Sequence, residues 1–179
     1  PIDQASHLTK YQHPPSYIFL KSNLNFSDLK FSNVKKYKII HAPSNAVIKG
    51  TPLVRKAIER LKTEKYVFEY KELSNIDNKT LMHELRESHI VLNQFYSLVP
   101  GMLGIESMAN HCAVLMSADP KIEKNLPSSA IDAWMVTTSS DIYKNLKYLL
   151  DNKDEIKKYA DSGYYFVENN YTEEHVKKY

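Results

Sequence analysis

The sequence predicts an α/β fold, a Rossmann-like parallel sheet with helices on both faces. Three observations support this prediction. Strand-like and helix-like segments alternate from residue 37 onwards and are joined by short connections. Several strand candidates are short apolar runs, as expected for buried parallel strands. The 179 residues, 42% of them apolar, are enough for one domain with a sizeable core.

The strand predictions rest on short apolar or alternating runs. YKIIHA contains β-branched residues, YVFEYKEL alternates between apolar and polar positions, and IVLNQ and AVLM are apolar. The predicted strands are residues 37–42, 66–73, 90–94, 113–116 and 133–138. Each is followed by a helix candidate or a loop, which favours parallel pairing.

The helix predictions rest on capping residues and helical periodicity. In TPLVRKAIERLKTE, Thr51 is the expected N-cap, Pro52 takes the first helical position, and apolar residues recur at helical spacing. The helices are expected over residues 51–64, 77–89, 101–111, 139–152, 153–170 and 172–179.

The chain divides into three parts by composition. Residues 1–36 are polar and irregular, and we expect a linker and entry segment with one short strand at 17–19. Residues 37–170 form the predicted Rossmann-like domain, and residues 171–179 a C-terminal helix.

Charge and composition exclude several classes of protein. The net charge of +3 is too small to indicate nucleic-acid binding. No apolar run reaches the roughly 18 residues that a membrane-spanning helix needs. Cys112 is the only cysteine, so an internal disulfide is impossible, which fits a reducing compartment such as the cytoplasm.

Ligands of open parallel sheets bind at the carboxyl ends of the strands. In PGMLGIESMA, Gly101 allows a sharp turn into a helix whose exposed amides and dipole favour an anion such as phosphate. Glu106 follows five residues later and can accept two hydrogen bonds from a vicinal diol such as ribose. Together they suggest a nucleotide diphosphate, although the spacing alone favours an ordinary helix cap and a surface Glu.

A second polar loop, HAPSNAVIKGT, follows the first predicted strand. Ser44 and Asn45 offer hydrogen bonds, and the ammonium of Lys49 could neutralise a departing diphosphate. Alone, a solvated lysine before a helix is the simpler interpretation. Two such loops at adjacent strand ends favour a shared crevice.

These residues carry a resemblance to a known family. IIHAPSNAVIKGTPLVRKAIERL resembles the opening of the nucleotide-sugar-binding domain of group 1 (family 4-like) glycosyltransferases, the C-terminal half of their GT-B fold. ESHIVLNQ and VPGMLGIESMANHCAVL resemble two later segments of that domain, and residues 143–171 resemble its terminal helices. The opening PIDQASHLTKY resembles the end of the linker from the first domain.

The resemblance implies a donor-binding domain that transfers a sugar from a nucleotide-diphosphate sugar to an acceptor. Its catalytic contributions would come from Lys49, which binds the diphosphate, and Glu106, which binds the ribose hydroxyls. The remaining contacts would come from the amides of Gly101, Met102 and Leu103 to phosphate, from Leu73 and Ser74 to the base, and from Ser44, Asn45 and Gln94 along the pocket.

The resemblance also implies the setting of the reaction. No metal or other cofactor is required, and the acceptor, a sugar or a lipid-linked molecule, would bind an N-terminal domain that this chain lacks. The chain alone would therefore bind nucleotide without turnover. Polysaccharide or glycoconjugate biosynthesis is expected in the cytoplasm, and the parent protein could associate peripherally with the inner face of the membrane.

The sequence departs from the family pattern at several positions. Ala46 and Val47 occupy the space where an Arg is usual, Leu98 replaces a second Glu, and Asn93 replaces an Asp. His111 stands where the family has a small Gly, and Cys112 follows it. Packing is the favoured interpretation for both because neither has a partner at metal-ligand spacing.

Two alternative functions remain open from the sequence. One is a degenerate GT-B-like domain with a scaffolding role, suggested by Ala46 and Leu98. The other is a GT-B-like nucleotide-sugar epimerase. The spacing of HAPSN and KGT favours the transferase over this epimerase.

Overall fold

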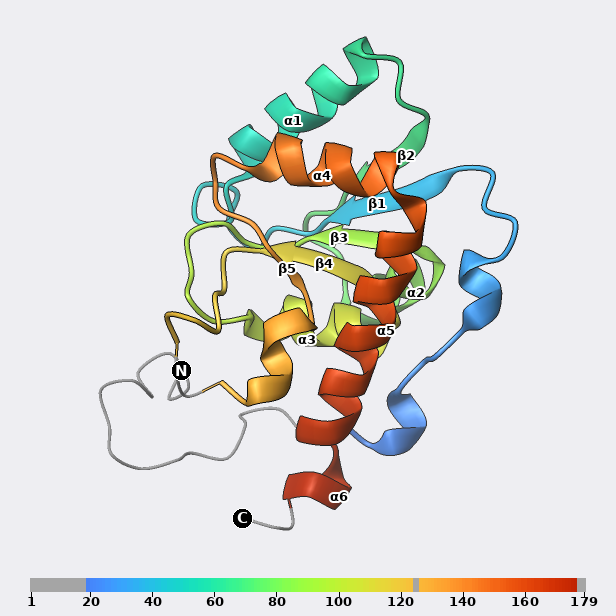
Figure 1. Ribbon diagram of the computed structural model, residues 1–179, viewed down its shortest axis with the longest axis vertical. Helices are drawn as coiled ribbons and strands as arrows, with labels where there is room; N and C mark the ends of the chain where they lie inside the picture. Colours follow the sequence, from blue (N-terminus) through green and yellow to red (C-terminus); the bar gives the residue numbers. More distant parts are fainter. Residues whose placement is uncertain (1–18, 124–125, 177–179) are drawn as a thin grey trace.

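The structure is a computed structural model that describes residues 19–123 and 126–176. Its centre is a five-stranded sheet in the order β2-β1-β3-β4-β5, with every pair parallel (Figure 1). The strands are β1 (Tyr37–His41), β2 (Phe68–Glu72), β3 (Ile90–Leu92), β4 (Ala113–Met116) and β5 (Met135–Val136). The predicted α/β class with a parallel sheet is confirmed.

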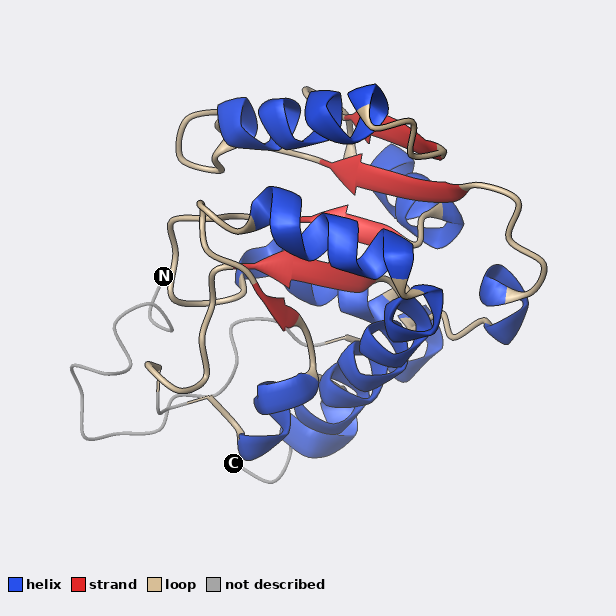
Figure 2. Ribbon diagram, turned by 45° about the horizontal axis from the view of Figure 1, so that its top comes forward, coloured by secondary structure: helices blue, strands red, loops and turns tan. Residues whose placement is uncertain are grey.

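Helices cover both faces of the sheet (Figure 2). The helices are α1 (Thr51–Thr63), α2 (Asn78–Glu87), α3 (Gly101–Ala109), α4 (Ile142–Asp151), α5 (Lys153–Asn170) and α6 (Glu173–Val176). Short 3-10 helices are η2 (Lys21–Asn23), η3 (Asp28–Phe31) and η4 (Ser128–Asp132). Helices α1 and α4 lie on one face, whereas α2, α3 and most of α5 lie on the other.

The sheet has one hydrophobic core on each face because successive strand residues point to opposite sides. In β4, Leu115 packs with the α1 and α4 side chains, and its neighbours Val114 and Met116 pack with those of α3 and α5. All four residues of β4 are buried. This central strand explains why the sequence there is a continuous apolar run.

The segment over 25–30, before β1, packs along the core on the α3 and α5 side of the sheet. The Asn25 amide donates to the Ala109 carbonyl at 2.9 Å, and Phe26 stacks on His111 with ring centroids 4.2 Å apart. The ammonium of Lys30 donates to the carbonyls of Asn110 and Leu85 at 2.8 and 3.1 Å. This segment therefore holds the ends of α2 and α3.

Several predicted bounds need correction. Thr51 is not an N-cap but the first residue of α1, with its hydroxyl 2.8 Å from His41 Nε2, and Gly50 takes the cap position with φ of 76°. The predicted strand 133–138 shortens to β5, because η4 and a turn flank it.

Three further predictions concern the ends of elements. The predicted helix 139–152 begins only at Ile142, after a turn. In the predicted strand 17–19, only Phe19 is described, and it forms an isolated bridge to Thr172. Of the predicted final helix, the structure forms α6, and residues 177–179 lie outside the described residues. Residues 1–18 of the predicted linker also lie outside them.

At Gly163, α5 packs tightly against the core. A Cβ at this position would lie 2.8 Å from the Ala133 carbonyl oxygen and 2.8 Å from Met108 Cγ. We expect Gly163→Ala to destabilise the domain by about 1 to 3 kcal/mol, despite the higher helix propensity of alanine, because a backbone atom cannot yield. Urea unfolding measures this effect. Asn169→Ala, at an exposed position of the same helix, is the control. A Gly163→Ala variant as stable as this control would contradict the packing described.

Candidate functional site

The strand order creates one topological switch point. From β1 the chain continues into α1 on one face, and from the neighbouring β3 it continues into α3 on the other face. In open parallel sheets, ligands bind in the crevice outside the carboxyl ends of two such strands. The loops over 42–50 and 93–100 follow β1 and β3, so the two loops singled out in the sequence lie at the same end of adjacent strands. We refer to this strand-end region as the crevice.

The side chain of Gln94 joins the two loops. Lys49 Nζ donates a hydrogen bond to Gln94 Oε1, and Gln94 Nε2 donates to the Val99 carbonyl at 2.7 Å. A Cβ at Gly101 would lie 3.2 Å from Gln94 Nε2. Lys49 and Gly101, which are far apart in the sequence, therefore both lie against the same Gln94 amide.

Lys49 is a cation without a counterion at this site. Its side chain is half-buried, and burial lowers the pKa of its ammonium from the ordinary value. Among the described residues, no carboxylate forms an ion pair with it. A half-buried, unpaired ammonium is costly in the free protein and favourable beside an anion.

The turn before α3 leaves the first amides of the helix without a side-chain cap. The first amides of any α-helix lack intrahelical acceptors. In α3, Pro100 occupies the N-cap position and offers no side-chain acceptor in their place. Asn93 Nδ2 holds the Pro100 carbonyl at 2.6 Å. Because the trans peptide is planar, the N–H of Gly101 points away from the buried Asn93. The left-handed φ of 66° at Gly101 makes this turn possible.

The second glycine serves packing. A Cβ at Gly104 would lie 2.7 Å from Asn93 Nδ2 and 3.2 Å from Met116 Sδ. Asn93 stands where the resembling family has Asp, and its amide donates a hydrogen bond that an ionised carboxylate lacks. Within the described part of the chain, the buried Oδ1 of Asn93 has no hydrogen-bond partner.

Glu106 lies farther along α3, beside the start of α2. Its Oε1 accepts a hydrogen bond from Asn78 Nδ2 at 3.4 Å. Burial raises the pKa of its carboxyl above the usual value, and the Asn78 bond opposes this shift. Leu73 and Ser74 lie on the loop that leads from β2 into α2, and the Leu73 amide donates to the His41 carbonyl at 2.8 Å. No hydrogen bond in the described residues links Glu106 to Lys49.

The other predicted site residues lie on the loop over 42–50 and on the first turn of α3. Asn45 Oδ1 accepts from the amides of Val47 and Ile48, both at 3.0 Å, so it shapes the loop. Ser44 is exposed. Met102 has an exposed side chain, whereas that of Leu103 is buried, which leaves its backbone as the only group that could face a ligand.

Two of the departures from the family pattern, Val47 and Leu98, lie exposed on the two loops and form what we call the rim, whereas Asn93 is buried. Val47 is 76% exposed and Leu98 is 47% exposed, and Ile48, Tyr96 and Met102 are also exposed on these loops and on the first turn of α3. The rim is therefore apolar where the resembling family carries charge.

His41, His111 and Cys112 are buried away from the crevice surface. The two nitrogens of His41 contact the Leu92 carbonyl at 2.7 Å and the Thr51 hydroxyl at 2.8 Å. His111 Nε2 lies 2.6 Å from Asp161, and Cys112 Sγ accepts from Lys30 at 3.3 Å. Burial lowers the pKa of both histidines and raises that of the Cys112 thiol.

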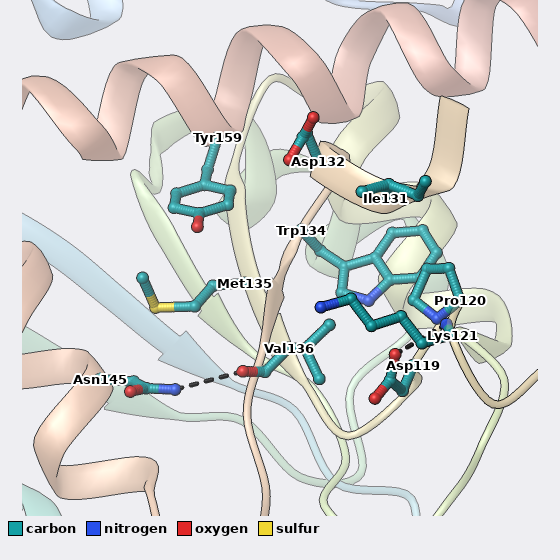
Figure 3. Close-up of a pocket in the computed structure, with 10 residues that line it drawn as sticks. All are labelled: Asp119, Pro120, Lys121, Ile131, Asp132, Trp134, Met135, Val136, Asn145 and Tyr159. Carbon is teal, nitrogen blue, oxygen red and sulfur yellow. Dashed lines mark hydrogen bonds between the residues drawn. The ribbon is translucent and has the colours of Figure 1, made fainter. Parts of the chain in front are cut away.

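A separate hollow of about 420 Å³ lies beside β5 (Figure 3). Its lining includes Asp119, Asp132, Trp134, Asn145 and Tyr159. Asn145 donates to the Val136 carbonyl, which is on the sheet edge. No residue predicted from the sequence for the nucleotide site lines this hollow.

The comparisons with known proteins bear on the fold. No protein-family model matches the chain, and no curated protein matches it. A solved structure, the C-terminal domain of a glycosyl transferase group 1 family protein (LpcC) from Francisella tularensis, is similar with a TM-score of 0.57 and 18% identity. The match covers 87% of this chain and 99% of that chain. The chain has the fold of the C-terminal half of a GT-B glycosyltransferase. In the described residues, no helix is long and apolar enough to span a bilayer.

Glu106 yields a pH-dependent prediction. The pKa of its carboxyl is raised in the folded state, so ionisation of this group disfavours folding. Its contribution to the free energy of unfolding therefore falls as the pH rises from the unfolded-state pKa through the folded-state pKa. We expect Glu106→Gln to be more stable than the wild type near neutral pH, with the difference vanishing in acid. Urea unfolding at several pH values measures this. An equal difference at all pH values would show that burial of the charge is not the cause.

Proposed function

We propose that this chain is the donor-binding domain of a glycosyltransferase and that its crevice holds the nucleotide diphosphate of a sugar donor. The observation that carries the proposal is the contact of Lys49 and the Gly101 turn with the same Gln94 amide. An unpaired ammonium and the uncapped N-terminus of α3 thus lie against one side chain, and both favour an anion.

The proposed chemistry is electrostatic. In sugar transfer, negative charge develops on the departing diphosphate, and a fixed cation and aligned amides stabilise that charge more in the transition state than in the substrate. Lys49 and the amides of Gly101, Met102 and Leu103 fill these roles. Glu106 accepts hydrogen bonds from the ribose hydroxyls, and Leu73 and Ser74 border the base.

The proposal extends to the partners of the reaction. The acceptor and any general base would belong to an N-terminal domain, and this crevice would need no metal. A role in polysaccharide or glycoconjugate biosynthesis, in the cytoplasm or at the inner face of the membrane, is part of the same proposal and follows from the resemblance.

Calorimetric titration with UDP, GDP and ADP tests the proposal. We expect one of them to bind saturably, and Lys49→Ala to weaken it by about 10- to 100-fold, the value of a charge-assisted hydrogen bond. Glu106→Ala should weaken binding of the diphosphate and of the corresponding nucleoside alike, because it contacts the ribose. Lys62→Ala, an exposed lysine on α1, is the control.

Binding that survives both Lys49→Ala and Glu106→Ala would refute the assigned site. Absence of binding in the wild-type chain and also in a longer chain carrying the preceding domain would favour the scaffolding alternative.

A further inference from the structure

We propose that Gln94 is a positioning residue that presents the Lys49 ammonium to the donor diphosphate while leaving its charge intact. This inference rests on the proposed function and assigns to Gln94 a task beyond lining the pocket. Gln94 acts through Lys49 and through the turn before α3.

The orientation of the Gln94 amide is fixed at both ends. Its Nε2 donates to the Val99 carbonyl at 2.7 Å, and its Oε1 accepts from Lys49 Nζ. A reversed amide would place two oxygens together at Val99 and two donors together at Lys49. Gln94 is only 6% exposed, so surrounding protein also restrains it. The oxygen therefore faces the cation in a defined position.

A neutral oxygen suits this task better than a carboxylate. An ammonium has three N–H donors, and the bond to Gln94 uses one of them, which leaves two for phosphate oxygens. A carboxylate at the same place would form an ion pair and cancel the charge that the diphosphate requires. Gln94 thus holds the ammonium in place without neutralising it.

The same amide sets the spacing between the cation and the glycine turn. Its Nε2 ties down the Val99 carbonyl, two residues before Gly101, and a Cβ at Gly101 would approach Nε2 to 3.2 Å. If the amide is lost, Lys49 and the turn are no longer held by a common group. The two parts of the anion site would then move independently.

Two variants separate this role from simple packing. In Gln94→Glu, we expect the pKa of Lys49 to rise above its wild-type value, as followed by the NMR shift of its Cε carbon, and diphosphate affinity to fall at least about tenfold. Asn169→Asp, which adds the same charge at an exposed position of α5, should change neither quantity. Circular dichroism and thermal unfolding check that each variant is folded.

Gln94→Met keeps the length of the side chain and removes its hydrogen bonds. We expect about a tenfold loss of diphosphate affinity and a much smaller loss for the nucleoside, which lacks phosphate. In the Lys49→Ala background the same change should cause a clearly smaller loss, because the part of its effect that passes through Lys49 is already gone and only the part that passes through the turn remains.

The outcomes distinguish the two proposals. Unchanged diphosphate affinity in Gln94→Met, or an unchanged Lys49 pKa in Gln94→Glu, would overturn the role of Gln94 while nucleotide binding by the wild type still supported the proposed function. Equal losses from Gln94→Met with and without Lys49 would likewise overturn it. A wild-type protein that binds no nucleotide would overturn both.

Discussion

The hydrogen bonds between the end of β3 and the turn before α3 are the constraint on which the crevice depends. Asn93 and Gln94 follow the last residue of β3, and their side-chain amides hold the successive carbonyls of Pro100 and Val99. The Pro100 carbonyl is thereby held by the buried Asn93, and the Gly101 N–H of the same planar peptide points the opposite way. The close approach of Gly104 to Asn93 keeps α3 at this position.

The two charged residues of the proposed site are both held in surroundings that disfavour their charge. Burial lowers the pKa of Lys49 and raises the pKa of Glu106. Shifts of this kind reduce folding stability, and they gather at functional sites because a ligand can repay the lost hydration. The apolar cores on both faces of the sheet supply the stability that such a site requires.

The sheet was predictable from sequence because buried parallel strands are apolar, whereas the role of Gln94 was not. Placing Lys49 and Gly101 at one crevice needed only the rule that parallel strands end at the same edge. The contact between Lys49 and Gln94 joins residues 45 positions apart and leaves no periodic signal. Thr51 was misplaced because a threonine before a proline resembles a cap, and its bond to His41 is a tertiary contact.

The apolar rim changes how charge is distributed at the crevice more than it changes its total. Relative to the family pattern, Val47 stands in the region of a usual cation and Leu98 in place of a usual carboxylate, and both side chains are exposed. One positive and one negative group are thus missing together from the rim, and the buried Asn93 replaces a further carboxylate of the family pattern at the end of β3. Without that cation, Lys49 would be the principal positive charge for an anion at the proposed site. Because charges near apolar, poorly hydrated surface interact more strongly than charges in open water, the position of that one ammonium becomes decisive. A fixed neutral acceptor such as Gln94 is the means by which that position is kept.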